Sequence, residues 1–120
     1  MSTPDRRWHL VFNGAIYNFR ALRAELVSSH DFKTDCDTEV LLAALAHWGS
    51  DALPRLRGMF AFALWASRER TLLLARDPFG IKPLYFHTTS DGGLLFASEL
   101  NALLASGCVP AAIDPQAVSE

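Results

Sequence analysis

The stretch that decides the fold is Met59-Phe60-Ala61-Phe62-Ala63-Leu64-Trp65, followed by Ser67-Arg68-Glu69-Arg70 and then Thr71-Leu72-Leu73-Leu74-Ala75. The first and third segments are apolar at odd and even positions, which is typical of strands covered on both faces. The four polar residues between them predict a turn, so the two strands should form a hairpin. The sequence therefore predicts a sheet that belongs to a layered structure.

A second hairpin is predicted further along the chain. Leu84-Tyr85-Phe86 and Leu94-Leu95-Phe96 flank Ser90-Asp91-Gly92-Gly93, and this combination is typical of two strands joined by a tight turn. A short helix is expected from Ser98 to about residue 105. The charged loop that separates the two hairpins covers residues 76–83.

The first half of the chain carries helical patterns. Trp8-His9-Leu10-Val11-Phe12 reads as a short strand, which the turn signal Asn13-Gly14 should stop. Apolar residues then recur at helical spacing over residues 17–27 and again over residues 37–48. Helices that precede consecutive hairpins indicate an α+β fold rather than alternating βα units.

Composition narrows the class of protein. The 120 residues include 11 Lys and Arg and 13 Asp and Glu, for a net charge of −2, which argues against nucleic-acid binding by bulk electrostatics. No apolar run approaches the ~20 residues of a membrane span, and no signal peptide is evident. Cys36 and Cys108 are far apart and form no metal-ligand pattern. We expect a cytoplasmic globular domain with no metal, membrane or nucleic-acid partner, and too short for a second catalytic domain.

Five segments occur in an order and spacing that resemble the class II glutamine amidotransferase domain of glutamine-hydrolysing asparagine synthetase. They are Asn13-Gly14-Ala15-Ile16-Tyr17-Asn18, Asp35-Cys36-Asp37-Thr38-Glu39-Val40, the run 57–65, Arg76-Asp77-Pro78-Phe79-Gly80-Ile81-Lys82-Pro83-Leu84-Tyr85, and Phe96-Ala97-Ser98-Glu99-Leu100. The resemblance covers about residues 8–104, which is most of the chain.

The resemblance implies an N-terminal-nucleophile hydrolase, a four-layer αββα sandwich with antiparallel sheets, here in an incomplete form. Residues 1–107 would be a partial amidotransferase domain, and residues 108–120 a linker-like tail toward a synthetase domain. In that family an N-terminal cysteine releases ammonia from L-glutamine. The ammonia then reaches the synthetase domain, where ATP and Mg are used to amidate aspartate, so no cofactor is expected in this chain itself.

The resemblance also assigns candidate site residues. The side-chain amide of Asn13 and the backbone N–H of Gly14 correspond to the family's oxyanion hole, whose donors must face the developing negative charge. Asp37 corresponds to the aspartate that holds the α-ammonium group of glutamine. Ala15 stands at a substrate-contact position where the family has glutamate, so it removes one partner of that ammonium group.

Other departures from the family pattern bear on activity. Only twelve residues precede Asn13, and they contain no cysteine and no Arg-Gly-Pro-Asp segment, whose arginine pairs with the glutamine carboxylate. Asn101 replaces a common lysine. We expect the 120-residue polypeptide alone to release no ammonia from glutamine.

Two residues in the chain could in principle act as a substitute nucleophile. Ser2 is disfavoured because it would lie far from Asn13 if the intervening chain is extended. Cys36 precedes a helix N-terminus, where a thiol pKa can fall, but a small packed residue is the favoured interpretation. Arg76-Asp77 is interpreted as a salt-bridged corner, with a domain interface or ammonia route as the alternative.

The remaining expectations concern packing and the role of the whole chain. The core is predicted to contain the three tryptophans, Trp8, Trp48 and Trp65, together with the phenylalanines. The four histidines are predicted to be surface or packing residues. The favoured function is a fragment of a glutaminase domain; a catalytically inactive module that binds glutamine or a partner, and a truncated reading frame without its own role, are alternatives. Unpaired strand edges predict self-association or poor solubility.

Overall fold

The computed structural model describes residues 1–112, and it divides into two compact units, Met1–Lys82 and Pro83–Glu120. Both units are mixed α and β with antiparallel strand pairs, so the predicted α+β class is confirmed. The elements in chain order are β1 (Trp8–Ile16), α1 (Phe19–Leu26), α2 (Asp37–Trp48), the 3₁₀ helix η1 (Gly49–Arg55), β2 (Gly58–Ala66), β3 (Thr71–Arg76), β4 (Tyr85–Thr88), β5 (Leu94–Ala97) and α3 (Leu100–Ala105).

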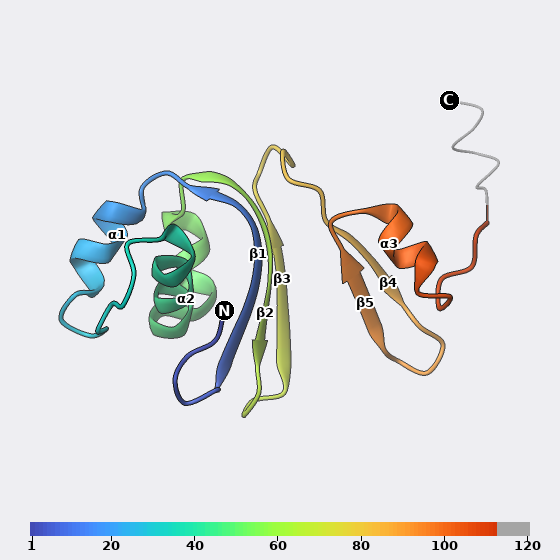
Figure 1. Cartoon of the computed structure of the whole chain (residues 1–120), viewed down its shortest axis with the longest axis horizontal. Helices are drawn as coiled ribbons and strands as arrows, with labels where there is room; N and C mark the ends of the chain where they lie inside the picture. The colour runs from blue at the N-terminus through green and yellow to red at the C-terminus, as the bar shows by residue number, and fades with distance from the viewer. Residues whose placement is uncertain (113–120) are drawn as a thin grey trace. The chain divides into compact units, whose positions relative to one another are not determined.

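The first unit is a three-stranded sheet covered on one face by helices (Figure 1). The strand order is β1-β2-β3, and both neighbouring pairs are antiparallel. Helix α2 packs against β1, and α1 packs against α2. The predicted hairpin around residues 67–70 is therefore confirmed as β2 and β3, with Ala66 opposite Thr71.

Alternate strand residues build the core between the sheet and the helices. Leu10, Leu64 and Leu73 lie side by side across the three strands on the helix-facing side. Trp8 and Trp48 are partly buried against the same core, in line with the prediction for them. The buried members of this core are Leu10, Ile16, Leu22, Leu26, Val40, Leu41, Leu42, Ala43, Ala44, Leu45, Ala52, Leu56, Phe60, Phe62 and Leu64.

The other face of the sheet is covered less completely than the apolar pattern predicts. Ala61 and Ala63 are buried there, but Val11 is 65% exposed and Trp65 is 38% exposed. The prediction that Trp65 is a core residue is wrong, because its position in β2 alternates with Leu64 and so faces away from the helices. This face is apolar and partly open to solvent in the first unit.

Helix α2 begins and ends where the sequence predicts. Cys36 precedes it in an extended conformation, and Gly49 follows with a φ of 58°, a left-handed conformation that glycine adopts without a steric penalty. The 3₁₀ helix that comes next was not predicted, since its only strong local signal is Pro54 near its end. Helix α1 falls within the predicted range of residues 17–27.

Strand β1 does not stop at Asn13-Gly14, so that part of the prediction is wrong. Both residues are paired with β2, Asn13 with Ala61 and Gly14 with Phe60. Gly14 has a φ of 151°, and a Cβ there would lie 2.1 Å from the carbonyl oxygen of Met59. The glycine therefore allows a close approach of two strands rather than a turn.

The second unit holds the other predicted hairpin, β4 paired with β5, together with the short helix α3. Leu103 of α3 is buried, while Tyr85 and Phe86 of β4 are exposed. The prediction that the phenylalanines are core residues is therefore wrong for Phe86, and it is also wrong for Phe79, which is exposed. Of the predicted tail, residues 108–112 contain no helix or strand, and residues 113–120 lie outside the described part of the chain. No helix in the described part is long and apolar enough to cross a membrane.

Candidate functional site

The outer edge of β1 presents backbone N–H groups that a ligand could use, and that of Gly14 is among them. The N–H of Leu10 donates to the Met1 carbonyl at 2.7 Å, and the N–H of Ile16 donates to the Asp37 carboxylate at 2.9 Å, so even-numbered residues direct their backbone groups away from β2. Gly14 lies between these two positions in the same alternation. Its N–H therefore points off the sheet edge, and no acceptor for it is found among residues 1–112.

The Asn13 side chain lies next to this N–H in the chain. Asn13 alternates with the helix-facing residues of β1, so its side chain is on the opposite face of the sheet, where it is exposed. Its amide has no hydrogen-bond partner in the described part of the chain. Asn13 and Gly14 thus supply two adjacent uncommitted donors, the kind of group that stabilises an oxyanion.

The loop before α2 brings Asp37 to the same segment of β1. Asp37 is the first residue of α2, is half-buried, and accepts the N–H of Ile16 through Oδ2. The hydroxyl of Thr38 lies 3.5 Å from the other carboxylate oxygen, Oδ1. Because neither contact is cationic, the carboxylate keeps its capacity to pair with an ammonium group.

Ala15 separates Gly14 from Ile16 and adds no polar side-chain atom. It pairs with Met59 in β2, on the same sheet face as Asn13. Of the four predicted site residues Asn13, Gly14, Ala15 and Asp37, only Asp37 carries a charge. Asn13, Gly14 and Ala15 are consecutive in β1, and Asp37 contacts the same end of the strand through the N–H of Ile16, so the four residues include a single acidic group.

Glu39 is a buried carboxylate that the sequence reasoning missed. The residue is 8% exposed, and its carboxylate accepts the backbone N–H groups of Lys33 at 2.9 Å and Thr34 at 2.7 Å and the Thr34 hydroxyl at 2.6 Å. Its Oε1 also lies 3.5 Å from Nε2 of His30. Glu39 therefore holds the loop that precedes Asp37. The available sequence signal was a second acidic residue in the first turn of the helix.

The environment of Glu39 keeps it ionised. Burial by itself would raise its pKa, but the hydrogen bonds from the Thr34 hydroxyl and from the two backbone N–H groups outweigh burial and lower the pKa to about 2. The carboxylate is thus charged at neutral pH, in the form that accepts all three bonds.

Asp77 organises the loop that follows β3. It is 4% exposed, and its carboxylate accepts four backbone N–H groups, those of Phe60, Phe79, Ile81 and Lys82. Burial alone would raise its pKa, but these bonds to the charged form outweigh it and lower the pKa below its ordinary value. A buried carboxylate with this many donors fixes the loop backbone.

The exposed side chain of Arg76 also holds this loop in place. Its guanidinium donates to the carbonyls of Lys82 at 2.6 Å and Gly80 at 2.5 Å. Arg76 and Asp77 make no ion pair with each other among residues 1–112, so the predicted corner exists but is held by backbone hydrogen bonds rather than by a salt bridge. Phe79, at the tip, is 88% exposed.

The two substitute nucleophiles are placed differently from each other. Ser2 forms a bridge with His9, with its Oγ 2.8 Å from His9 Nδ1, so the chain before β1 folds back rather than extending. His9 is four residues before Asn13, about 13 Å along a strand. Cys36 lies beside Asp37, with its Sγ 3.0 Å from the Thr34 hydroxyl, as a half-buried packing residue.

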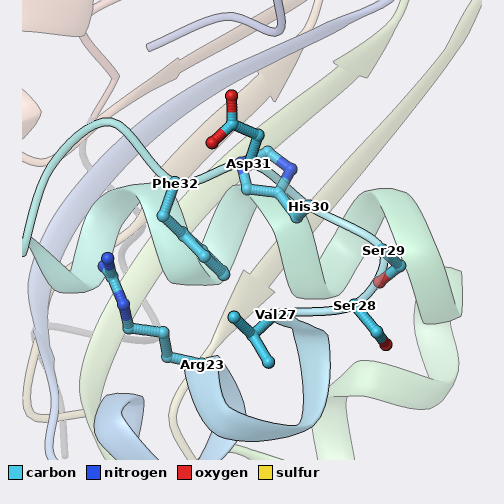
Figure 2. A pocket seen from close by; sticks show the side chains of 7 residues that line it. All are labelled: Arg23, Val27, Ser28, Ser29, His30, Asp31 and Phe32. Carbon is cyan, nitrogen blue, oxygen red and sulfur yellow. The ribbon is translucent and has the colours of Figure 1, made fainter.

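A surface hollow of about 490 Å³ lies at the end of α1 (Figure 2), and none of the four predicted residues lines it. Arg23 in it is already engaged, with its guanidinium 4.4 Å from the centre of the Phe32 ring and donating to the Thr34 carbonyl at 2.5 Å. The lining residues are Arg23, Val27, Ser28, Ser29, His30, Asp31 and Phe32. In the described part of the chain no group of three His, Cys, Asp or Glu residues is placed to hold a metal ion.

An α+β unit with uncommitted donors at a strand edge beside a helix-borne aspartate is consistent with the amidotransferase class. The model of the glutamine amidotransferase domain family matches residues 1–120 of this chain. The chain belongs to that family.

The curated relatives narrow the comparison to one kind of amidotransferase. The chain is 56% identical over 103 residues to a Mycobacterium tuberculosis (strain ATCC 25618 / H37Rv) protein whose name places it among the glutamine-hydrolyzing asparagine synthetases; the match covers 84% of this chain and 16% of the relative. It is 48% identical to asparagine synthetase [glutamine-hydrolyzing] 1 of Bacillus subtilis (strain 168), over 88% of this chain and 17% of the relative. It is 46% identical to asparagine synthetase B [glutamine-hydrolyzing] of Escherichia coli (strain K12), over 79% of this chain and 17% of the relative. The chain therefore spans about one sixth of the length of these relatives.

Proposed function

We propose that the end of β1 and the start of α2 form part of a glutamine-binding site for amide hydrolysis. The observation that carries the proposal is the Gly14 N–H, which is left out of the sheet ladder between Asn13 and the Asp37 carboxylate. In this site the Asp37 carboxylate holds the α-ammonium group of L-glutamine. The Asn13 amide and the Gly14 N–H face the side-chain carbonyl oxygen, which becomes negatively charged when a nucleophile adds to the amide carbon.

The proposal assigns no nucleophile among the described residues. The Ser2 hydroxyl is hydrogen-bonded to the His9 ring, four residues before Asn13 in β1. The Cys36 thiol is hydrogen-bonded to the Thr34 hydroxyl. The site residues therefore bind and orient glutamine and stabilise charge. The relatives are named as glutamine-hydrolyzing asparagine synthetases. The resemblance to that family implies that the released ammonia would serve an ATP- and magnesium-dependent amidation of aspartate in the cytoplasm; no step proposed for this chain passes through ATP or a metal.

The test is a titration of the ¹⁵N-labelled chain with L-glutamine, followed by amide chemical shifts and by calorimetry. We expect the amides of Gly14 and Ile16 to shift on binding. The variant Asp37→Asn should weaken binding about tenfold or more, because a charge-assisted hydrogen bond is worth roughly 1.5–3 kcal/mol. The control Asp51→Asn removes an exposed carboxylate from η1 and should leave binding unchanged.

Two outcomes would overturn the proposal: no shift of the Gly14 and Ile16 amides at millimolar glutamine, or equal weakening by Asp37→Asn and Asp51→Asn. An ammonia assay run on the same samples separates a hydrolase from a binding module. Binding without ammonia release favours the alternative of an inactive glutamine-binding module. Ala15 counts against that alternative, because it removes one partner of the α-ammonium group.

A further inference from the structure

Two turns lie together at the end of the sheet opposite the glutamine-site residues. The turn of residues 3–7 precedes β1, and the turn of residues 67–70 joins β2 to β3. Ser67 connects them, since its N–H donates to the Arg7 carbonyl at 2.8 Å and its hydroxyl donates to the Arg6 carbonyl at 2.9 Å. We refer to residues 3–7 and 67–70 as the arginine turn pair.

The arginine turn pair concentrates positive charge on a chain that is acidic as a whole. It contains four of the chain's 11 basic side chains but only two acids, in a molecule of net charge −2. Each acid forms an ion pair with one arginine: Glu69 pairs with Arg7, and Asp5 pairs with Arg68 at 3.4 Å. The remaining two, Arg6 and Arg70, are exposed and have no carboxylate partner among residues 1–112.

These same two arginines adopt an unfavourable backbone conformation. Arg6 has a φ of 54° and Arg70 a φ of 53°, and they are the two non-glycine residues with positive φ in the described chain. Glycine or asparagine adopts this left-handed region at lower cost than arginine. The turn conformation therefore does not explain an arginine at either position, and the side chain is the part that needs an explanation.

The turn that carries Arg6 is held rigidly by its own hydrogen bonds. The Asp5 carboxylate accepts the Thr3 hydroxyl at 2.7 Å and the Arg7 N–H at 3.1 Å, and His9 Nε2 donates to the Arg6 carbonyl at 2.9 Å. A rigid surface loses little conformational entropy when it binds a partner, so binding by a preorganised turn is favoured.

We propose that the arginine turn pair is a docking surface for a short acidic segment of another protein. Guanidinium groups bind carboxylates through paired hydrogen bonds, and the two unpaired arginines match two or three neighbouring carboxylates. Binding to a nucleic acid depends on neutralising many phosphates with Lys and Arg, and the pair offers only two arginines without a carboxylate partner.

The test compares two variants of the chain that lose the same charge in different places. Arg6→Asn/Arg70→Asn removes the two unpaired arginines and inserts a residue suited to left-handed φ. Arg20→Gln/Arg55→Gln removes two exposed arginines from α1 and η1. The probe is a deca-glutamate peptide, titrated at 25 mM and 150 mM NaCl and followed by fluorescence anisotropy, with phosphatidylserine vesicles as a second probe.

We expect the chain to bind the peptide more weakly at the higher salt concentration, and Arg6→Asn/Arg70→Asn to weaken binding at least fivefold without lowering the melting temperature. The Arg20→Gln/Arg55→Gln variant should bind like the unchanged chain. The proposal is overturned if both variants weaken binding equally, if the peptide does not bind at 25 mM NaCl, or if only the vesicles bind. A lowered melting temperature of Arg6→Asn/Arg70→Asn would also count against it, because that result would give the arginines a structural role.

Discussion

Single residues in this chain often serve the backbone and the site together. Asp37 begins α2 and also accepts the Ile16 N–H, so the carboxylate that we assign to the ammonium group of glutamine is fixed by a strand. Gly14 allows β1 to approach β2 and leaves its own N–H at the sheet edge. At this scale, stability and binding depend on the same atoms, so a substitution at either residue should affect both.

Gly14→Ala should be strongly destabilising, by roughly 2–4 kcal/mol of unfolding free energy, because the new Cβ would collide with the β2 backbone and φ is positive. The measurement is urea unfolding followed by tryptophan fluorescence. Gly49→Ala is the matched control, since Gly49 also has a positive φ but no atom lies within 4 Å of the position of its Cβ. The control should cost only about 1 kcal/mol. Equal destabilisation by the two variants would show that the collision is not the cause.

At the scale of elements, two buried carboxylates replace regular secondary structure as the support of loops. Glu39 binds the backbone of the loop before α2, and Asp77 binds four backbone N–H groups around the loop after β3. Each loop therefore has a fixed shape without a strand or helix of its own. The exposed Phe79 is presented on such a fixed loop.

The Glu39 contribution to stability should depend on pH in a defined direction. Its folded-state pKa of about 2 is below the value near 4.5 of a free glutamate, so its contribution is fully present above pH 5 and is lost as the pH falls toward 2. Glu39→Gln should lower the unfolding free energy by about 1–3 kcal/mol at pH 7, and the difference should shrink toward zero near pH 2.

The measurement for Glu39 is urea unfolding of both proteins between pH 2.5 and 7. Glu25→Gln is the control, because Glu25 forms an exposed pair with Arg55, and such pairs contribute little. A difference between Glu39→Gln and the unchanged chain that stays constant across this range would contradict the assigned pKa.

At the scale of the whole molecule, most elements could be predicted from the sequence because their signals are local. The 3.6-residue period over α2, the Gly49 helix end and the polar turn at residues 67–70 all follow from neighbouring residues. The continuation of β1 through Asn13-Gly14 could not be predicted in this way, because pairing with a strand some fifty residues later overrides a local turn signal. The exposure of Trp65 likewise depends on which face the helices cover.

The candidate site was predicted by resemblance rather than by spacing. Asp37 lies more than twenty residues after Asn13 and Gly14. Nothing in the local pattern of either segment indicates the hydrogen bond between Ile16 and Asp37. Glu39 was missed because an acid in a first helical turn is usually explained by the helix dipole. Its backbone partners, Lys33 and Thr34, become evident only when the loop is folded.

The first unit should associate in a concentration-dependent way. No strand in the described part of the chain covers the outer edge of β3, and the sheet face that bears Val11 and Trp65 is apolar and open. Unpaired edges and apolar faces favour association. Multi-angle light scattering of the 120-residue chain from 10 µM to 1 mM should show a rising mean mass, and Leu72→Lys, next to Trp65 on β3, should reduce the rise. A monomer mass throughout would refute the expectation.

The close approach of β1 and β2 has a consequence for strand register. A Cβ at Gly14 would meet the Met59 carbonyl, and a Cβ at Gly58 would meet the Ala15 carbonyl, each at 2.1 Å, so each strand has a glycine where the other strand comes closest. A slip of one residue would bring a side chain into each of these contacts and would also turn Asn13 toward the helices. The two glycines therefore disfavour the neighbouring registers, and the remaining pairing determines which way the Asn13 amide and the Gly14 N–H face.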